Sequence, residues 1–182
     1  MSPLAAIQPI ETTLADELED TFRLHSRLVY RTAYSVTGSA HDAEDVVQTL
    51  FLRLLRRGFP PEFQRNPKAY LYRAAVNLSL NAVKSRQREP SAIDPAQLEL
   101  VIAADESGVA RAKADLQTRL VAAIAQLNPR AVEMLILKYE HDTSEAEIGR
   151  LLGTSRGVVA VTLFRARARL KKLLRAASGE KS

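Results

Sequence analysis

Cysteine and tryptophan are absent from the 182 residues, and glycine and proline are scarce, at 7 and 8 residues. Without cysteine the chain cannot build a disulfide scaffold, a cysteine-ligated zinc site or an iron-sulfur cluster. No apolar run approaches the ~18 residues that cross a bilayer, and the N-terminus lacks the basic and apolar segments of a secretory signal. The length excludes a large multi-domain enzyme. We therefore expect a cytoplasmic protein of one or two small domains with no membrane partner.

Charged residues are unevenly distributed along the chain, although the net charge is only +5. Residues 1–52 carry eight acidic and three basic side chains, whereas residues 66–88 carry five basic side chains and no acid. Acids dominate residues 89–118, and seven bases without an acid occupy residues 156–175. Two separate basic stretches in a small protein favour two contacts with a nucleic acid. Solvated faces of ordinary helices would give the same charge pattern.

Apolar residues recur at helical spacing in the long intervals between glycines and prolines, and strand patterns are absent from the sequence. The pattern predicts an all-α protein. Gly38 is placed to end the first long helix, Asp42 to cap a second helix over residues 43–57, and a third helix follows from Tyr70. The prolines within residues 59–67 predict a loop between the second and third helices.

Residues 89–108 break this periodicity, contain two prolines and are acidic, so they predict a connector between two domains. The predicted organisation is an N-terminal extension (1–17), a first domain (18–89), a linker (90–112), a second domain (113–178) and a C-terminal tail (179–182). The predicted fold is therefore two small helical domains joined by a flexible linker.

The second domain carries the pattern of a helix-turn-helix. Ser144 and Glu147 have the spacing of a capping box at the start of a short helix. A turn over residues 153–155 leads to a longer helix with a basic flank and an apolar stripe from Val159 to Leu173. This pattern favours DNA binding, although an ordinary helical hairpin has the same spacing.

Residues 18–88 and 116–176 resemble bacterial sigma factors of the sigma-70 family, in particular the small two-domain extracytoplasmic-function (ECF) branch. The strongest match is Asp42–Arg53 (DAEDVVQTLFLR), and a second is Asn66–Asn77 (NPKAYLYRAAVN); both are similar to region 2 of the family. Leu127–Leu170 is similar to region 4, which in the family contains a helix-turn-helix.

The first match implies a docking surface for RNA polymerase core, on the clamp helices of its largest subunit. The residues that it implicates are Asp42, Glu44, Asp45, Gln48 and Phe51. The three acids also fit a capping cluster at the positive end of a helix. A metal site is disfavoured because no histidine stands at ligand spacing on the same face, and we expect neither a metal nor a cofactor.

The second match implies capture of the minus-ten promoter element as single-stranded DNA. Such capture needs cations for the backbone and stacking or hydrogen-bonding groups for the bases. The residues that this match implicates are Tyr70, Tyr72, Arg73, Asn77, Asn81, Lys84, Arg86 and Arg88. Packing in the core is the alternative role for at least one of the two tyrosines.

The third match implies recognition of the minus-thirty-five promoter element. The residues that it implicates are Ser155, Arg156, Gly157, Val161, Thr162, Arg165, Arg167, Arg169 and Lys172. The recognition helix has valines where the family usually has a hydroxyl, a lysine and an arginine. Because valine offers no hydrogen bond to a base edge, we expect phosphate contacts to carry the affinity and sequence reading to be weak. A protein interface is the competing interpretation of exposed valines.

The resemblance implies a non-enzymatic sigma factor that joins RNA polymerase core through the clamp helices and the flap. Such a protein directs promoter recognition and DNA melting, and an anti-sigma factor is a further partner that the resemblance implies. Two other functions fit the residues. One is a helix-turn-helix regulator that binds duplex DNA on its own, and the other is a helical protein that sequesters a partner.

Overall fold

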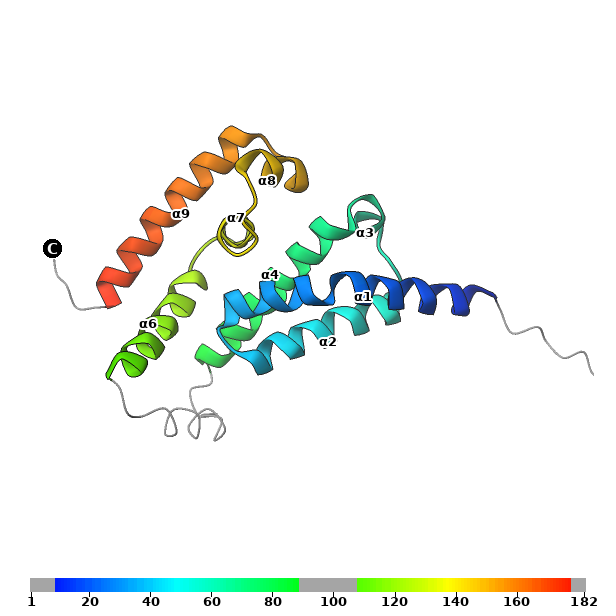
Figure 1. Ribbon diagram of the computed structural model, residues 1–182, viewed down its shortest axis with the longest axis horizontal. Helices are drawn as coiled ribbons and strands as arrows, with labels where there is room; N and C mark the ends of the chain where they lie inside the picture. Colours follow the sequence, from blue (N-terminus) through cyan, green and yellow to red (C-terminus); the bar gives the residue numbers. More distant parts are fainter. Residues whose placement is uncertain (1–8, 89–107, 178–182) are drawn as a thin grey trace, which may run out of the picture.

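The computed structural model describes residues 9–88 and 108–177, and within these two ranges the chain forms eight helices and no strand (Figure 1). An N-terminal unit holds α1 (Pro9–Thr37), α2 (Ala40–Arg57), α3 (Pro61–Arg65) and α4 (Pro67–Arg88). A C-terminal unit holds α6 (Gly108–Ile124), α7 (Pro129–Tyr139), α8 (Glu145–Leu152) and α9 (Arg156–Ala177). The all-α prediction is confirmed. None of these helices has the length and hydropathy of a membrane-spanning segment.

The predicted linker falls only partly within the described residues. Helix α6 begins at Gly108, so residues 108–112, which were predicted as the end of the linker, are helical. Residues 90–107 of the linker, residues 1–8 of the predicted extension and the predicted tail lie outside the described residues.

The junction between α1 and α2 differs from the prediction. Helix α1 ends at Thr37, and Gly38 follows with a φ of 67°. Ser39 is the N-cap of α2, because its Oγ accepts a hydrogen bond from the amide of Asp42 at 3.2 Å. The predicted capping role of Asp42 and the predicted helix start at residue 43 are therefore wrong, since Ser39 caps the helix three residues earlier and Asp42 lies within its first turn.

Prolines stand at the start of four helices. Pro9 begins α1, Pro61 begins α3, Pro67 begins α4 and Pro129 begins α7, at positions where the missing amide would have no partner in the helix. The predicted loop over residues 59–67 is therefore wrong for Pro61–Arg65, which form α3.

The helix-turn-helix is present as predicted. Ser144 and Glu147 form the capping box of α8, with the Ser144 amide donating to Glu147 Oε2 at 3.0 Å. Gly153 closes α8 in the left-handed conformation, with a φ of 66°. A Cβ on Gly149 would lie 2.8 Å from the carbonyl oxygen of Thr154, so the turn can pass this close to α8 only because residue 149 is glycine.

Helix α4 lies at the centre of the molecule, and most of its buried side chains belong to three hydrophobic cores, the smallest of which holds Val83 with Val121 and Ala125. Leu71 and Ala75 are buried in a core shared with α1 and α2. Tyr72, Val76 and Leu80 are buried in a second core, whose other members come mainly from α7, α8 and α9. A third face of α4 carries polar residues and is open to solvent. The two units are thus packed against each other through the second core.

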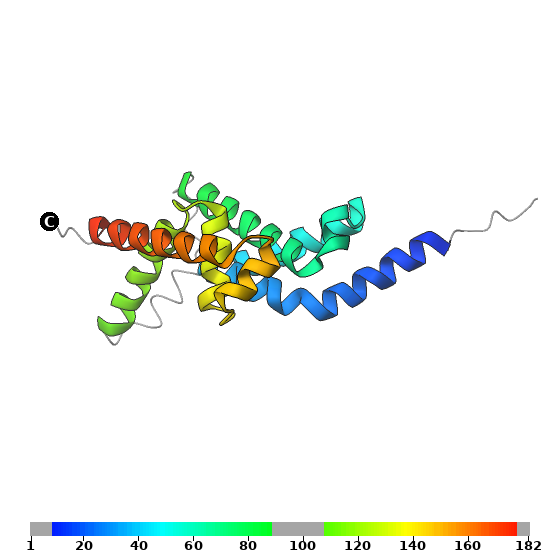
Figure 2. The same ribbon diagram turned by 90° about the horizontal axis from the view of Figure 1, so that it is seen from above.

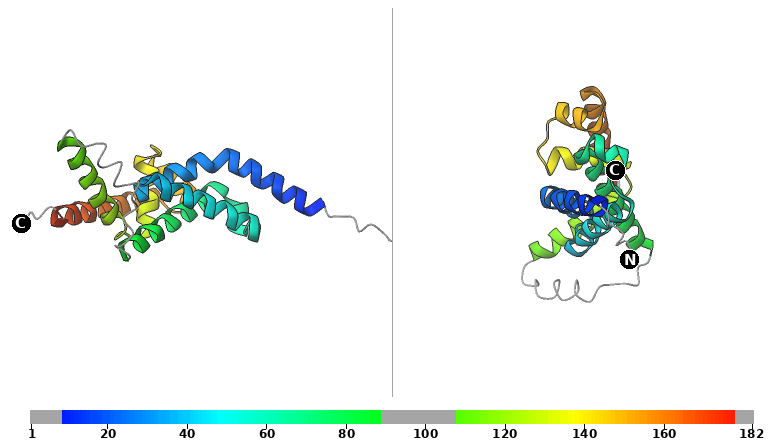
Figure 3. Two further views of the ribbon diagram at one scale, coloured as in Figure 1. Left: turned by 90° about the horizontal axis from the view of Figure 1, so that it is seen from below. Right: turned by 90° about the vertical axis from the view of Figure 1, so that its right-hand side faces the viewer.

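The molecule is elongated. The first turns of α1 extend beyond the rest of the N-terminal unit at one end, and α6 and the last turns of α9 form the other end (Figures 1 and 2). The end-on view in Figure 3 shows α8 and α9 on one side of the α1–α2 pair. This arrangement leaves the outer face of α2 uncovered by the C-terminal unit.

Candidate functional site

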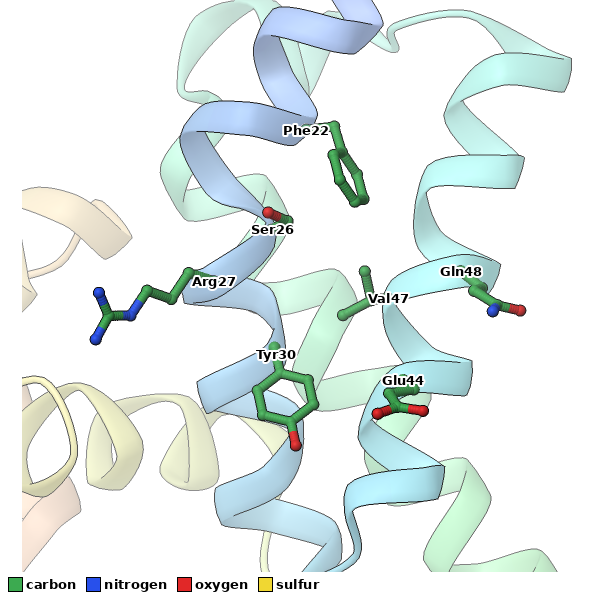
Figure 4. A pocket seen from close by; sticks show the side chains of 7 residues that line it. All are labelled: Phe22, Ser26, Arg27, Tyr30, Glu44, Val47 and Gln48. Carbon is green, nitrogen blue, oxygen red and sulfur yellow. The ribbon is translucent and has the colours of Figure 1, made fainter.

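An open groove of about 510 Å³ runs between α1 and α2. Its lining residues are Phe22, Ser26, Arg27 and Tyr30 from α1, and Glu44, Val47 and Gln48 from α2. Phe22 and Val47 point into the space between the two helices, whereas Arg27 and Gln48 point outward on opposite sides (Figure 4). The groove therefore combines an apolar floor with a polar rim.

The five residues predicted to dock the polymerase have different surroundings. Glu44, Asp45 and Gln48 are exposed on the outer face of α2. Asp42 is half-buried and pairs with Arg86, with 2.5 Å between Oδ2 and Nη1. Phe51 is 7% exposed, and its ring packs edge to face against Phe22 with the centroids 4.9 Å apart. Three of the five are thus open to a partner, and Phe51 supports the groove from beneath.

The sequence alone does not identify the α1 side of the groove. Phe22, Ser26 and Tyr30 recur every four residues, which places them on one helix face. That spacing could have identified them once α1 and α2 were taken as neighbours. On the α2 side, His41 lies one turn before Asp45 and 3.6 Å from it, so the expectation that no histidine shares this face is wrong. The described residues nevertheless contain no group of three side chains that could hold a metal ion.

A second, smaller pocket of about 280 Å³ brings together half of the residues predicted to bind the minus-ten element. Tyr70, Arg73, Asn77 and Asn81 all line it from one face of α4. The sequence alone does not indicate the other polar lining residues, Arg53 of α2 and Glu62 of α3. The pocket thus offers a ring, amides and guanidinium groups at one place.

The other four residues of this set lie elsewhere on α4. Tyr72 is 1% exposed and belongs to the core, so the core-packing alternative is confirmed for one of the two tyrosines. Lys84 is half-buried, and Arg88 is exposed at the end of the helix. Arg86 pairs with Asp42 and donates to the carbonyl oxygen of Thr37 at 3.2 Å, which ties α4 to the junction of α1 and α2.

The residues predicted to contact the minus-thirty-five element lie on the outer side of α9 and on the turn before it. Eight of the nine are exposed and Thr162 is half-buried, while Val159, Leu163 and Ala166 face the core. Val158, Val161 and Phe164 are also exposed, the last at 68%. Arg156 lies 3.8 Å from Glu145, and Arg167 donates to the hydroxyl of Tyr139 at 3.2 Å. The outer side of α9 is therefore basic with an apolar start.

An ion pair joins the two units at the end of α7. Arg31 of α1 donates to Glu140 Oε1 from Nε at 3.0 Å and from Nη2 at 2.8 Å. Its Nη2 also donates to the carbonyl oxygen of Glu140 at 2.8 Å. The guanidinium therefore contacts both the side chain and the backbone of one residue in the other unit.

Further contacts between the units centre on α4. The ring of Tyr72 packs edge to face against His141, with the centroids 5.1 Å apart, and His141 Nε2 lies 3.2 Å from Thr32 Oγ1. Arg73 Nε lies 3.9 Å from Oε1 of Glu133, a residue of α7 that is 3% exposed. Residues predicted to bind DNA are thus engaged by the C-terminal unit.

The contact between the units favours neutral forms of its titratable rings. Burial first, and then the nearby Arg31, lower the pKa of His141, while Glu140 acts in the opposite direction and Lys68 lowers it further. Burial raises the pKa of the Tyr72 hydroxyl. Both rings are therefore uncharged at neutral pH.

Comparison with protein families assigns both units to the same family. The sequence matches Sigma-70 region 2 over residues 21–89 and Sigma-70, region 4 over residues 117–170. The chain belongs to the sigma-70 family. Region 2 covers most of α1 and all of α2 to α4, and region 4 begins within α6 and ends within α9.

Its relatives are ECF sigma factors and place the chain in the ECF branch. The ECF RNA polymerase sigma factor SigE of Mycolicibacterium smegmatis is 32% identical over 169 residues, which is 89% of this chain and 63% of the relative. SigW of Bacillus subtilis, also an ECF RNA polymerase sigma factor, is 26% identical over 170 residues, 88% of this chain and 90% of the relative. The chain thus spans less than two thirds of the length of SigE and most of SigW.

Among solved structures, the sigma factor RpoE in complex with the anti-sigma factor NepR from Bartonella quintana has a TM-score of 0.49 and 22% sequence identity. The match covers 87% of this chain and 97% of that chain.

Proposed function

We propose that this protein is a sigma factor that binds RNA polymerase core and directs promoter recognition and DNA melting in transcription initiation. The observation that carries the proposal is the presence of sigma-70 regions 2 and 4 in one chain, each with an exposed surface suited to its task. The first unit offers the groove and the polar pocket, and the second offers the outer side of a helix-turn-helix.

The groove between α1 and α2 is the proposed site for the clamp helices of the polymerase. Phe22 and Val47 would receive apolar side chains of an incoming helix. Glu44 and Asp45, exposed on the rim and beside it, would attract a basic partner and fix its orientation.

The pocket on α4 is the proposed site for the unpaired minus-ten strand. Tyr70 would stack on a base, and Asn77 and Asn81 would hydrogen-bond to base edges. Arg53 and Arg73 would neutralise phosphates of the backbone. These groups supply the kinds of contact that a separated strand requires.

The outer side of α9 is the proposed contact with the minus-thirty-five element. Arg165, Arg169 and Lys172 are exposed and would bind phosphates. Val158 and Val161 reach only methyl groups of thymine, so this helix should discriminate weakly among bases. The polymerase flap is the protein partner proposed for this unit.

We infer no catalytic role for the chain. Its binding energy would position the polymerase and stabilise separated strands, while the polymerase performs the chemistry. It would therefore act in the cytoplasm together with the polymerase, and an anti-sigma factor is a further proposed partner.

In vitro transcription with purified core polymerase and a promoter library tests the function. A sigma factor produces new start sites that are absent with core polymerase alone. A regulator would instead bind duplex DNA by itself and produce no start sites. A sequestering protein would bind the polymerase or another partner, again without start sites. Either of these two results would overturn the proposal.

A further inference from the structure

The outer side of α9 carries an uncharged strip along its middle. Val161 and Phe164 are its largest members, and they are 48% and 68% exposed. The buried residues of α9 lie on the opposite face of the helix, so the core does not need this strip. The four residues of the strip are exposed and recur at spacings of four, three and four positions: Gly157, Val161, Phe164 and Ala168.

Basic side chains border the uncharged strip on both sides. Helical spacing places Arg165 and Lys172 along one edge, and both are exposed. Arg167 and Lys171 are exposed along the other edge. Residues 156–175 contain no acid. The charge across the outer side of α9 is therefore positive at both edges and zero in the middle.

This charge pattern fits the major groove of duplex DNA. The groove is about 12 Å wide and admits one α-helix, with phosphates along both walls and base edges on its floor. In a helix-turn-helix the second helix lies in this groove, and α9 is the second helix of the motif. The two basic edges would then face the two rows of phosphates, while the strip would face the bases.

The strip can recognise one feature of the bases. Val161 and Phe164 have no hydrogen-bonding group, so they do not respond to the donors and acceptors of the base edges. The C5 methyl of thymine is the apolar group that an unmodified base presents in the major groove. 5-Methylcytosine carries the same methyl group at the same position of its ring.

We propose that Val161 and Phe164 form a binding site for the C5 methyl groups of pyrimidines in the upstream promoter element, so that thymine and 5-methylcytosine are read alike. This assignment rests on the proposed function, because it takes α9 as the contact with the minus-thirty-five element. Methylation of a cytosine under the strip therefore strengthens recognition of a promoter that has cytosine in place of thymine.

A protein partner is the other occupant that fits an exposed apolar strip. Such a partner would need acidic side chains on both sides of an apolar segment to match the basic edges of α9. Duplex DNA supplies two rows of negative charge in every sequence, and it supplies a methyl group wherever thymine stands. The charge pattern therefore favours DNA.

Four versions of one promoter test the methyl site. The promoter comes from a library randomised over the upstream element, and each thymine of that element is replaced in turn by uracil, 5-methylcytosine or cytosine, with the matching base opposite. Thymine and 5-methylcytosine carry the methyl group. The hydrogen-bonding pattern is shared instead by thymine with uracil and by 5-methylcytosine with cytosine. Holoenzyme made from the full chain and core polymerase is measured for promoter affinity and for start sites.

At a position under the strip, we expect each methylated template to bind about fourfold more tightly than its unmethylated counterpart, as burial of one methyl group predicts. In the double variant V161A/F164A this ratio should fall towards one. Leu116→Ala is the matched control, because it removes an apolar side chain from a residue of α6 that is 51% exposed, and it should keep the ratio.

Equal affinity for thymine and uracil at every position, or for 5-methylcytosine and cytosine, would overturn the methyl site. A selected upstream element without A·T pairs would also overturn it. If V161A/F164A weakened binding equally on all four templates, the strip would serve a protein partner and the methyl site would again be wrong. Specific start sites that are indifferent to the methyl group refute this inference alone, whereas the absence of start sites on every template refutes the proposed function as well.

Discussion

The polymerase groove and the minus-ten surface lie on the same unit but differ in accessibility. Glu44, Asp45 and Gln48 are open to solvent on α2, whereas on α4 Tyr72 is buried under the C-terminal unit and Arg73, although exposed, lies 3.9 Å from Glu133 of that unit. The free chain can therefore meet a polymerase before it can present its whole DNA surface. One surface of the N-terminal unit is thus available to a partner, while packing of the C-terminal unit covers part of another.

Replacing Tyr72 should give the largest effect, because its ring lies in the core that joins the two units. We expect Tyr72→Ala to lower the free energy of unfolding by about 3 to 5 kcal/mol, measured by denaturant titration. Tyr70→Ala is the control, since Tyr70 is only half-buried and packs on Phe63 at 5.7 Å between centroids. Equal stability of Tyr72→Ala and the wild type would contradict the burial of Tyr72, whose ring would then be accessible to DNA.

A substitution inside the C-terminal unit tests the stability of that unit separately from its packing against the N-terminal unit. Gly149→Ala should destabilise the protein by about 1 to 3 kcal/mol, because the new Cβ would meet the Thr154 carbonyl oxygen at 2.8 Å. Gly157→Ala is the matched control, since its nearest neighbour would be Ser155 Oγ at 3.9 Å. Thermal unfolding of the two variants should differ clearly, and similar melting temperatures would contradict the close approach.

Substitutions on the exposed face of α2 test the proposed polymerase-docking surface. Asp45→Ala combined with Gln48→Ala should weaken binding of core polymerase by about tenfold at low salt and leave the helix content unchanged. Glu17→Ala removes an exposed acid outside the groove and should have little effect. Fluorescence anisotropy with labelled protein measures the affinity. Unchanged affinity of the double variant would remove α2 from the docking surface.

The packing of the C-terminal unit against the N-terminal unit should depend weakly on pH through His141. Its pKa is lower in this closed arrangement of the two units than the usual 6.5, so the closed form binds fewer protons than an open one. The closed form is therefore fully stable above pH 6.5 and loses stability as the pH falls from there through the lowered pKa. With spin labels at positions 64 and 171, the distance distribution should broaden over this range, and His141→Gln should reduce that change. A distribution that narrows on acidification would contradict the sign.

The sequence was sufficient for part of the local structure, above all for the helix-turn-helix, but it missed α3. The capping box of Ser144 and Glu147 and the inward stripe of α9 depend on neighbours within a few residues, so their spacing predicts them. The sequence does not single out Ser39 as the N-cap, because Asp42 is an equally good capping residue. The backbone conformation distinguishes the two residues.

Accessibility could not be predicted in the same way. The burial of Tyr72 and the pairing of Arg31 with Glu140 depend on contacts between residues far apart in the chain. Periodicity within α4 marks its apolar residues, but it does not tell which of them meet α1 and α2 and which meet α7. For the same reason the groove residues Phe22 and Tyr30 were recognisable only once α1 lay beside α2.

The most direct test of the closed free chain is the distance between spin labels at positions 64 and 171 of the otherwise unchanged protein, measured before and after addition of core polymerase. We predict one narrow distance population for the free protein and a clearly different one in the complex. A distance that stays the same in a sample shown to be bound to polymerase, or a broad distribution already present in the free protein, would contradict the closed arrangement.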